Sequence, residues 1–122
     1  MPTPNLINVD TITPKVKVGA ITTSRVDIVD VTDEYCAKIN SLTIANVDGT
    51  NAATVTVEVS TDNGSNYTAI ASTITVPADS SLVVVGKDNG FYLDETDLLA
   101  VTASADNDLT YIVSYEEMKD SA

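Results

Sequence analysis

Three short stretches of the sequence bring carboxylates close together: DETD at residues 94–97, DND at 106–108 and the EE pair at 116–117. Two carboxyl groups on opposite sides of a cleft are what glycoside hydrolysis needs. These stretches fall in predicted turns or near the end of the last predicted strand, and aromatic residues, which would stack on a sugar, make up only 5% of the chain. We therefore interpret the carboxylates as solvated turn acids and do not expect an enzyme.

Histidine is absent from the sequence. Its absence removes Ser/His/Asp and Cys/His nucleophilic sites, His-based acid–base chemistry and nearly all zinc sites. The five glycines are scattered singly, so neither a phosphate loop nor a dinucleotide fingerprint can form. The single cysteine, Cys36, cannot form an intramolecular disulfide and is interpreted as a small buried side chain on a strand. No catalytic site and no cofactor are expected.

Calcium is the one ion that the sequence leaves open as an alternative, because the loops are rich in hard oxygen ligands. The candidate ligands are Asp48, Asn51, Asp62, Asn63, Asp106 and Asp108. Their spacing does not match an EF-hand. The simpler interpretation is structural, since Gly, Asn, Asp and Pro reach left-handed dihedrals or close tight turns through local side-chain hydrogen bonds.

Short apolar runs between these turns are the main structural signal, with turns at spacings close to the ~8–12 residues expected of a sandwich or barrel. The runs with strand character are residues 15–24, 26–31, 36–47, 53–60, 67–76, 81–87, 90–93, 98–105 and 109–117. In the clearest run Val55, Val57 and Val59 alternate with polar residues, which predicts one buried face. No run has a sustained helical period. The pattern predicts an all-β, antiparallel β-sandwich of about eight strands, with jelly-roll or immunoglobulin-like closure.

The apolar phase of these runs predicts the core. The expected core residues are Val55, Val57, Val59, Ile70, Val84, Leu99, Val101, Tyr111 and Val113. Residues 1–14 differ, because they contain three prolines and little periodicity. They predict an extended N-terminal arm before a single sandwich domain at 15–122, although a frayed terminus is the alternative. If the arm pairs with a neighbouring subunit, we expect contacts through Pro4, Leu6 and Ile7.

The 122 residues fit one domain, and 18 acidic against 6 basic residues give a formal net charge of −12. Such a surface repels phosphate backbones and anionic membranes, so nucleic acid and membrane partners are not expected. No stretch approaches the ~20 apolar residues that cross a bilayer, and the opening MPTPNLINVD has no leader-like pattern. The sequence favours a soluble protein made in a cytosol.

Two long passages, KINSLTIANVDGTNAATVTVEVSTDNG and TITVPADSSLVVVGKDNGFYLDETDLLAVTASADNDLTYIVSYEEM, resemble small virion proteins of tailed bacteriophages. The resemblance covers residues 38–118, about two thirds of the chain, and its most specific pieces are NVDGTNAATVTV, VPADSSLVV, YLDETDLLAV and SYEE. It implies a β-sandwich structural protein without a catalytic motif. It also implies a location in the virion, after synthesis in the cytoplasm of a bacterial host.

If the resemblance extends to head-decoration, or cement, proteins, it implies a subunit on the outer capsid surface that stabilises the shell. Its partners would then be the major capsid protein and copies of itself, commonly as a homotrimer. A tail, neck or fibre-associated virion module is an alternative. A carbohydrate-binding β-sandwich is another, from a different functional class. The rings available to stack on a sugar are Tyr35, Tyr67, Phe91, Tyr92, Tyr111 and Tyr115.

Overall fold

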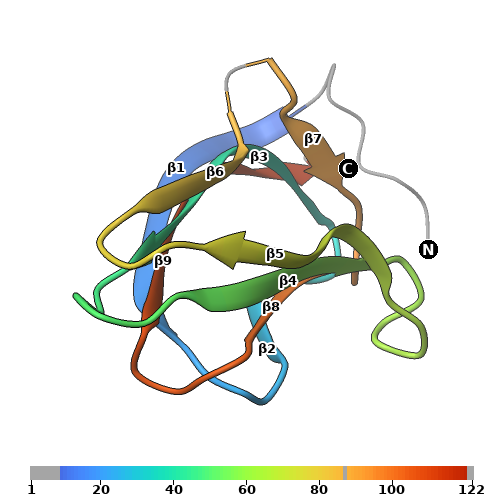
Figure 1. Ribbon diagram of the computed structural model, residues 1–122. Coiled ribbons are helices and arrows are strands. Elements are labelled where there is room, and N and C mark those ends of the chain that lie inside the picture. The colour runs from blue at the N-terminus through green and yellow to red at the C-terminus, as the bar shows by residue number, and fades with distance from the viewer. Residues whose placement is uncertain (1–8, 87, 121–122) are drawn as a thin grey trace.

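The computed structural model describes residues 9–86 and 88–120, and this part of the chain contains strands and no helix (Figure 1). The strands are β1 (Val9–Ile21), β2 (Val26–Asp30), β3 (Tyr35–Asn46), β4 (Ala53–Ser60), β5 (Thr68–Val76), β6 (Ser81–Val85), β7 (Phe91–Leu93), β8 (Leu98–Ala103) and β9 (Leu109–Asp120). Each strand overlaps one of the runs that the sequence predicts. The prediction of an all-β fold is confirmed.

The strands form two antiparallel sheets that pack on each other through a common core (Figure 1). Sheet A has the order β1-β9-β3-β6, with the short β7 also paired to β3, and sheet B has the order β2-β8-β4-β5. Apart from β4–β5 and β6–β7, consecutive strands lie in opposite sheets. This order is that of a jelly roll and differs from the ABED and CFG sheets of an immunoglobulin domain. The predicted sandwich is therefore confirmed, with the jelly-roll closure of the two that the sequence allowed.

The core lies between the inner faces of the two sheets. In sheet B, Val57 pairs with Val101, and in sheet A, Leu42 pairs with Val113, all four side chains being fully buried. Burying one such side chain contributes about 1.5–3 kcal/mol. The predicted core residues that are fully buried are Val55, Val57, Leu99, Val101 and Val113. Those that are half-buried against the core are Val59, Val84 and Tyr111.

Ile70 is the exception, and its predicted place in the core is wrong, because its side chain is 47% exposed. It lies on β5, an edge strand of sheet B, where the pairing with β4 shifts register on both sides of Val57. Register shifts of this kind bend an edge strand and re-aim its side chains. As a result Ala71, rather than Ser72 as in a regular continuation from the Val55–Ile74 pair, lies opposite the buried Val57.

β1 begins at Val9, earlier than the sequence predicts, so residues 9–14 pair with β9 as part of sheet A. Pro14 lies inside this strand. A proline has no amide hydrogen to donate, and β1 tolerates it because it is an edge strand. The sandwich therefore includes residues 9–14 of the expected arm.

The polar loops close tight turns, as their composition predicts. Between β4 and β5, Asn63 and Gly64 have φ angles of 58° and 91°, and the Gly64 amide donates a hydrogen bond to the Ser60 hydroxyl oxygen (2.8 Å). Asp79 and Asn107 also have positive φ, at 57° and 69°. Gly, Asn and Asp adopt these left-handed dihedrals at the least steric cost.

Candidate interaction surfaces

Two acids in the loops that connect the strands, Asp62 between β4 and β5 and Asp48 between β3 and β4, stabilise their own turns. Asp62 accepts hydrogen bonds from the Asn66 side chain (2.9 Å) and the Asn66 amide (2.8 Å), and these bonds lower the pKa of Asp62. Asp48 accepts from the amides of Thr50 (2.8 Å) and Asn51 (3.3 Å), which lower its pKa in the same way. These carboxylates are therefore occupied by local hydrogen bonds.

The other calcium candidates are dispersed. Asp106 accepts a hydrogen bond from the Thr23 amide (2.9 Å) and ties the β8–β9 loop to the β1–β2 loop. Asp108 lies near Asp48, and its pKa is raised by loss of solvation and by the charge of Asp48. Within residues 9–86 and 88–120, no group of three or more Cys, Asp or Glu side chains is placed to hold a metal ion.

The DETD stretch forms the turn between β7 and β8, and two of its three acidic side chains are buried. Glu95 and Asp97 are buried, and the Asp94 amide donates a hydrogen bond to Oδ2 of Asp97 (2.8 Å). Burial raises the pKa of Asp97. Oε2 of Glu95 has no hydrogen-bond partner among the described residues. This arrangement fixes the turn and does not present two carboxylates across an open cleft, which glycoside hydrolysis requires.

Cys36 lies buried on β3, which confirms the structural interpretation of this residue. Burial, with a smaller effect from the negative charge of Asp94, raises the pKa of the thiol. The thiolate, which is the nucleophilic form, is therefore disfavoured.

A cavity of about 540 Å³ opens beside the edge strand β1. It is lined by Lys15, Val16, Lys17, Asp30, Thr32, Tyr115 and Glu117. The Lys15 ammonium lies 2.9 Å from Oε1 of Glu117, and this contact raises the pKa of Lys15. Burial raises the pKa of Tyr115. The lining thus combines both signs of charge, with one lysine already paired.

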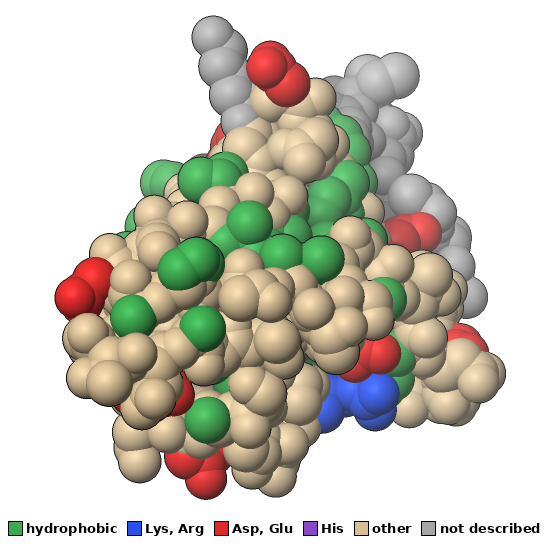
Figure 2. Space-filling view, viewed as in Figure 1, with side chains coloured by type: hydrophobic (Ala, Val, Ile, Leu, Met, Phe, Trp, Pro, Cys, Tyr) green, Lys and Arg blue, Asp and Glu red, His purple; other side chains and the backbone are tan. Residues whose placement is uncertain are grey.

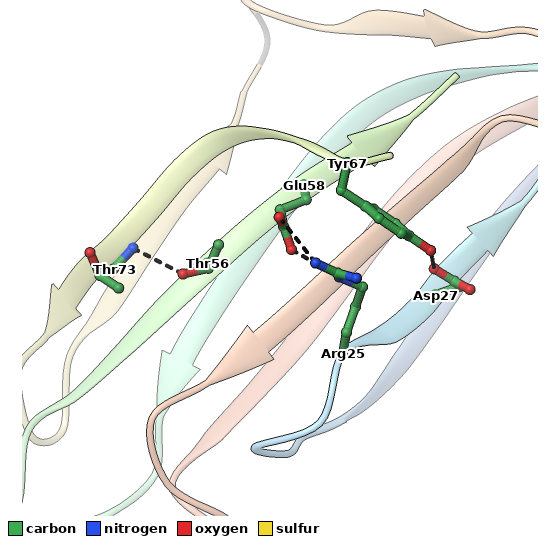
Figure 3. Close-up of polar contacts among 6 residues, drawn as sticks. All are labelled: Arg25, Asp27, Thr56, Glu58, Tyr67 and Thr73. Atoms are coloured by element: carbon green, nitrogen blue, oxygen red, sulfur yellow. Dashed lines mark hydrogen bonds and ion pairs between the residues drawn. The ribbon is translucent and has the colours of Figure 1, made fainter. Parts of the chain in front are cut away.

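The outer face of sheet B carries a polar cluster that joins distant parts of the chain (Figure 3). Just before β2, Arg25 binds Glu58 of β4, with 3.1 Å between Nε and Oε1. The Arg25 guanidinium also lies over the ring of Tyr67, 3.9 Å from its centroid, and the Tyr67 hydroxyl donates to Oδ1 of Asp27 (3.0 Å). We call these four residues the Arg25 cluster. Its charged groups interact with one another or with Tyr67, so the cluster connects β2, β4 and the start of β5 and leaves few polar groups available for a ligand.

The outer face of sheet A has a different character. Three adjacent rows of residues, in register across β1, β9, β3 and β6, contain no charged side chain, and we call them the uncharged face. From row to row they are Ala20, Thr110, Ala45 and Ser81; Val18, Ile112, Thr43 and Val83; and Val16, Ser114 and Ser41. On an ordinary surface about three of eleven residues would be charged. Its four large aliphatic side chains are well exposed: Val16 (65%), Val18 (67%), Val83 (62%) and Ile112 (52%).

This face is not evident from the sequence, because on β1 the lysines lie on the inner face of the sheet and the valines on the outer face. Lys15 and Lys17 pair with Tyr115 and the buried Val113, so they share the inner face of sheet A. The valines between and after them point outward, away from the core. Residues 11–18 are exposed on both faces of β1, since sheet B does not cover this length of the strand. No signal within the KVKV stretch distinguishes this arrangement from its reverse.

A second group of hydrophobic side chains lies over β5 and β6, on the side shown in Figure 2. These two edge strands lie next to each other, one from each sheet. Ile70 and Ile74 of β5 are partly exposed there, beside the half-buried Leu82 and Val84 of β6. Because Ile74 pairs with a core residue, this region is an incompletely covered margin of the core.

The aromatic residues considered for sugar binding are mostly unavailable for stacking. Tyr115 is buried, and Tyr67 is covered by Arg25. Only Tyr92 among them is largely exposed. The remaining rings are half-buried: Tyr35, Phe91 and Tyr111. The described residues therefore offer one exposed ring and no row of rings for a carbohydrate.

The arm contacts predicted at Pro4, Leu6 and Ile7 lie outside the described residues. Among the residues that are described, none forms a helix of the length and apolarity needed to cross a bilayer.

No protein-family model matches the sequence, and no curated protein matches it significantly. Among solved structures, the chain is similar to a subunit of the Bacillus endospore appendages, which are disulfide-linked pili (14% identity, TM-score 0.43, covering 91% of this chain and 88% of that one). It is also similar to two crystal structures of a pentameric capsid protein from metagenomic phage sequences (14% identity, TM-score 0.39, 94% of this chain). The chain spans 62% and 64% of these two capsid chains. Similarities at this level assign no function.

Proposed function

We propose that the chain is a noncatalytic structural subunit of a tailed-bacteriophage virion, and specifically a decoration, or cement, protein that binds the outer surface of the capsid. The observation that carries the structural role is the uncharged face of sheet A. A face of this kind, on a protein with a net charge of −12, favours an assembly contact over exposure to solvent. The assignment to a virion rests on the sequence resemblance over residues 38–118.

The resemblance and the fold are consistent with each other. Residues 38–118 contain β4 to β8 and most of β3 and β9, and these include the central strands of both sheets, β9 and β3 in sheet A and β8 and β4 in sheet B. The remaining strands, β1 and β2, each form one edge of a sheet, and the opposite edges are β6 and β5. The resemblance therefore covers most of the core, although Ile21, Ile28 and Val29 of the core precede it.

A noncatalytic role is supported by how the polar groups are used. Asp48 and Asp62 accept hydrogen bonds from backbone amides of their own turns. In the DETD stretch, Glu95 and Asp97 are buried, and Asp97 accepts a hydrogen bond from the Asp94 amide. The Arg25 cluster is paired within itself. A catalytic group instead has to be accessible and placed against a reacting atom.

The arm is part of this proposal. Residues 1–8, with Pro4, Leu6 and Ile7, would contact the major capsid protein or a neighbouring copy, in a homotrimer of the kind that decoration proteins form. Deleting residues 1–8 should then abolish capsid binding while leaving the melting temperature of the sandwich nearly unchanged. A deletion that preserves binding would remove the arm from the proposal.

The decoration role is tested by counting copies in purified particles of a phage that encodes this chain, by quantitative mass spectrometry against the major capsid protein. Hundreds of copies per particle are expected for a decoration protein. A few to a few dozen copies would replace it with the tail, neck or fibre alternative. Absence from particles that contain the other virion proteins would overturn the virion assignment.

A further inference from the structure

We infer that the uncharged face of sheet A binds the same face of a second copy of this chain. The inference concerns the isolated protein and holds whether or not the chain is a virion component. It rests on the composition of the face, the distribution of charge over the molecule and the area available.

The composition fits burial. In the middle row Val18, Ile112, Thr43 and Val83 lie side by side across four strands, and the flanking positions are Ala, Ser or Thr. Small side chains next to β-branched ones give a flat surface without projecting polar groups. Two sheets that pack face to face bury such surfaces about 10 Å apart. The central strands of the face, β9 and β3, would lie near a two-fold axis that relates the two copies.

The charge distribution favours a second copy on this side of the molecule. The strands of sheet A contain four lysines and four acids, and their charges cancel. The rest of the chain contains fourteen acids and two basic residues and so carries the whole net charge of −12. Two copies that met through sheet B or the loops would bring like charges together. Contact through sheet A keeps these charges on opposite outer sides of the pair.

The chain's own N-terminal residues are a poor alternative occupant. Residues 1–8 precede Val9, and Val18 lies nine residues further along β1, about 30 Å away at the rise of a strand. Eight residues span at most about 29 Å when fully extended. They would reach the margin of the uncharged face without covering Ile112 or Val83.

The area sets the expected strength. Four strands about 4.8 Å apart and three rows about 6.8 Å apart cover on the order of 400 Å² per copy, or about 800 Å² for the pair. This is below the standard size of a specific interface. We therefore expect weak association in isolation, with a Kd on the order of tens to hundreds of micromolar.

The test is light scattering and sedimentation equilibrium on the full chain, from about 10 to 500 μM. The wild-type average mass should rise from one chain towards two. Ile112→Glu should weaken association at least tenfold, because the contact would bury two like charges. Ile70→Glu is the matched control on the β5–β6 margin, with a similarly exposed isoleucine, and should associate as the wild type does. Circular dichroism melting confirms that each variant is folded.

A mixing experiment tests whether the same face of both copies is used. Ile112→Lys should also be monomeric, and an equimolar mixture with Ile112→Glu should regain association. Wild-type protein that stays monomeric at 500 μM, association that survives Ile112→Glu, or a mixture that stays monomeric would each overturn the inference. A trimer that persists in Ile112→Glu would also overturn the inference. The decoration role would still be tested separately, by the copy number in purified particles.

Salt gives an independent check on the same contact. Raising the salt from about 0.1 M to 1 M shortens the Debye length from about 10 Å to 3 Å and screens the repulsion between two chains of charge −12. Association through an uncharged face should therefore strengthen several-fold. Association that weakens in high salt would indicate ion pairs and would contradict the inference.

Discussion

The outer faces of the two sheets occupy equivalent positions in the jelly roll but have opposite characters. On sheet B, Arg25, Glu58, Tyr67 and Asp27 form contacts with one another, so the charged groups there have partners within the chain. On sheet A, Val16, Val18, Val83 and Ile112 of the uncharged face are each more than half exposed. The side chains on the outer face of a sheet can thus interact with one another, as on sheet B, or remain available for contact with another molecule, as on sheet A.

The largest difference in the free energy of unfolding should appear between truncating a core residue and truncating a residue on the uncharged face. Leu99→Ala, in the core side of sheet B, should lower the free energy of unfolding by about 2–5 kcal/mol, because Leu99 is fully buried. Val18→Ala should change it by less than about 0.5 kcal/mol. Urea unfolding at low protein concentration measures both. A Val18→Ala cost near that of Leu99→Ala would mean that this face is already covered within one chain.

Disrupting the Arg25 cluster should lower the free energy of unfolding by an intermediate amount. Arg25→Ala loses an exposed ion pair and a cation–π contact, which together contribute about 1 kcal/mol after solvent screening. The exposed Lys17→Ala is a control of similar size and should be nearly neutral. Self-association should be unchanged in Arg25→Ala, since this residue lies on the other sheet. A loss of association would contradict the contrast between the two faces.

The smallest effect concerns pH, because the loops titrate and the uncharged face does not. The folded state lowers the pKa of Asp62, so its stabilising effect is present above the unfolded value of about 3.9 and is lost as the pH falls through the lower folded value. Asp62→Asn should therefore be less stable than the wild type near pH 7, and the difference should shrink below about pH 4. Thermal melting across this range measures it. The effect of Val18→Ala should be independent of pH.

Much of the fold follows from local patterns. Alternation at Val55 and Val57 gives the phase of β4, and Leu109 and Val113 give that of β9, because both strands are central in their sheets and are covered along their length. Edge strands do not obey the same rule. Ile70 on β5 is displaced by register shifts, and β1 turns its valines outward where no second sheet covers it. Whether a strand is central depends on pairing between distant segments, which local periodicity does not contain.

The candidate surface was less predictable than the core. It joins residues from four strands, from Val16 near the beginning of the chain to Ser114 near its end, and none forms a motif in the sequence. The individual stretches are ordinary strands with Ser, Thr and aliphatic residues. Only the order β1-β9-β3-β6 places them in adjacent rows. The resemblance in the sequence led to the proposal of a virion structural protein, but no pattern in the sequence indicated the uncharged face.

The pairing of β1 with β9 also has a consequence for biosynthesis. Ile21 pairs with Leu109, so β1 has no strand partner in sheet A until β9 has been made. At about 5–20 residues per second, a ribosome needs on the order of ten seconds to cover this interval. During that time the outward valines of β1 are accessible on a nascent strand whose edges are both unpaired. Pro14 and the two neighbouring lysines are features that discourage such a strand from pairing with the wrong chain.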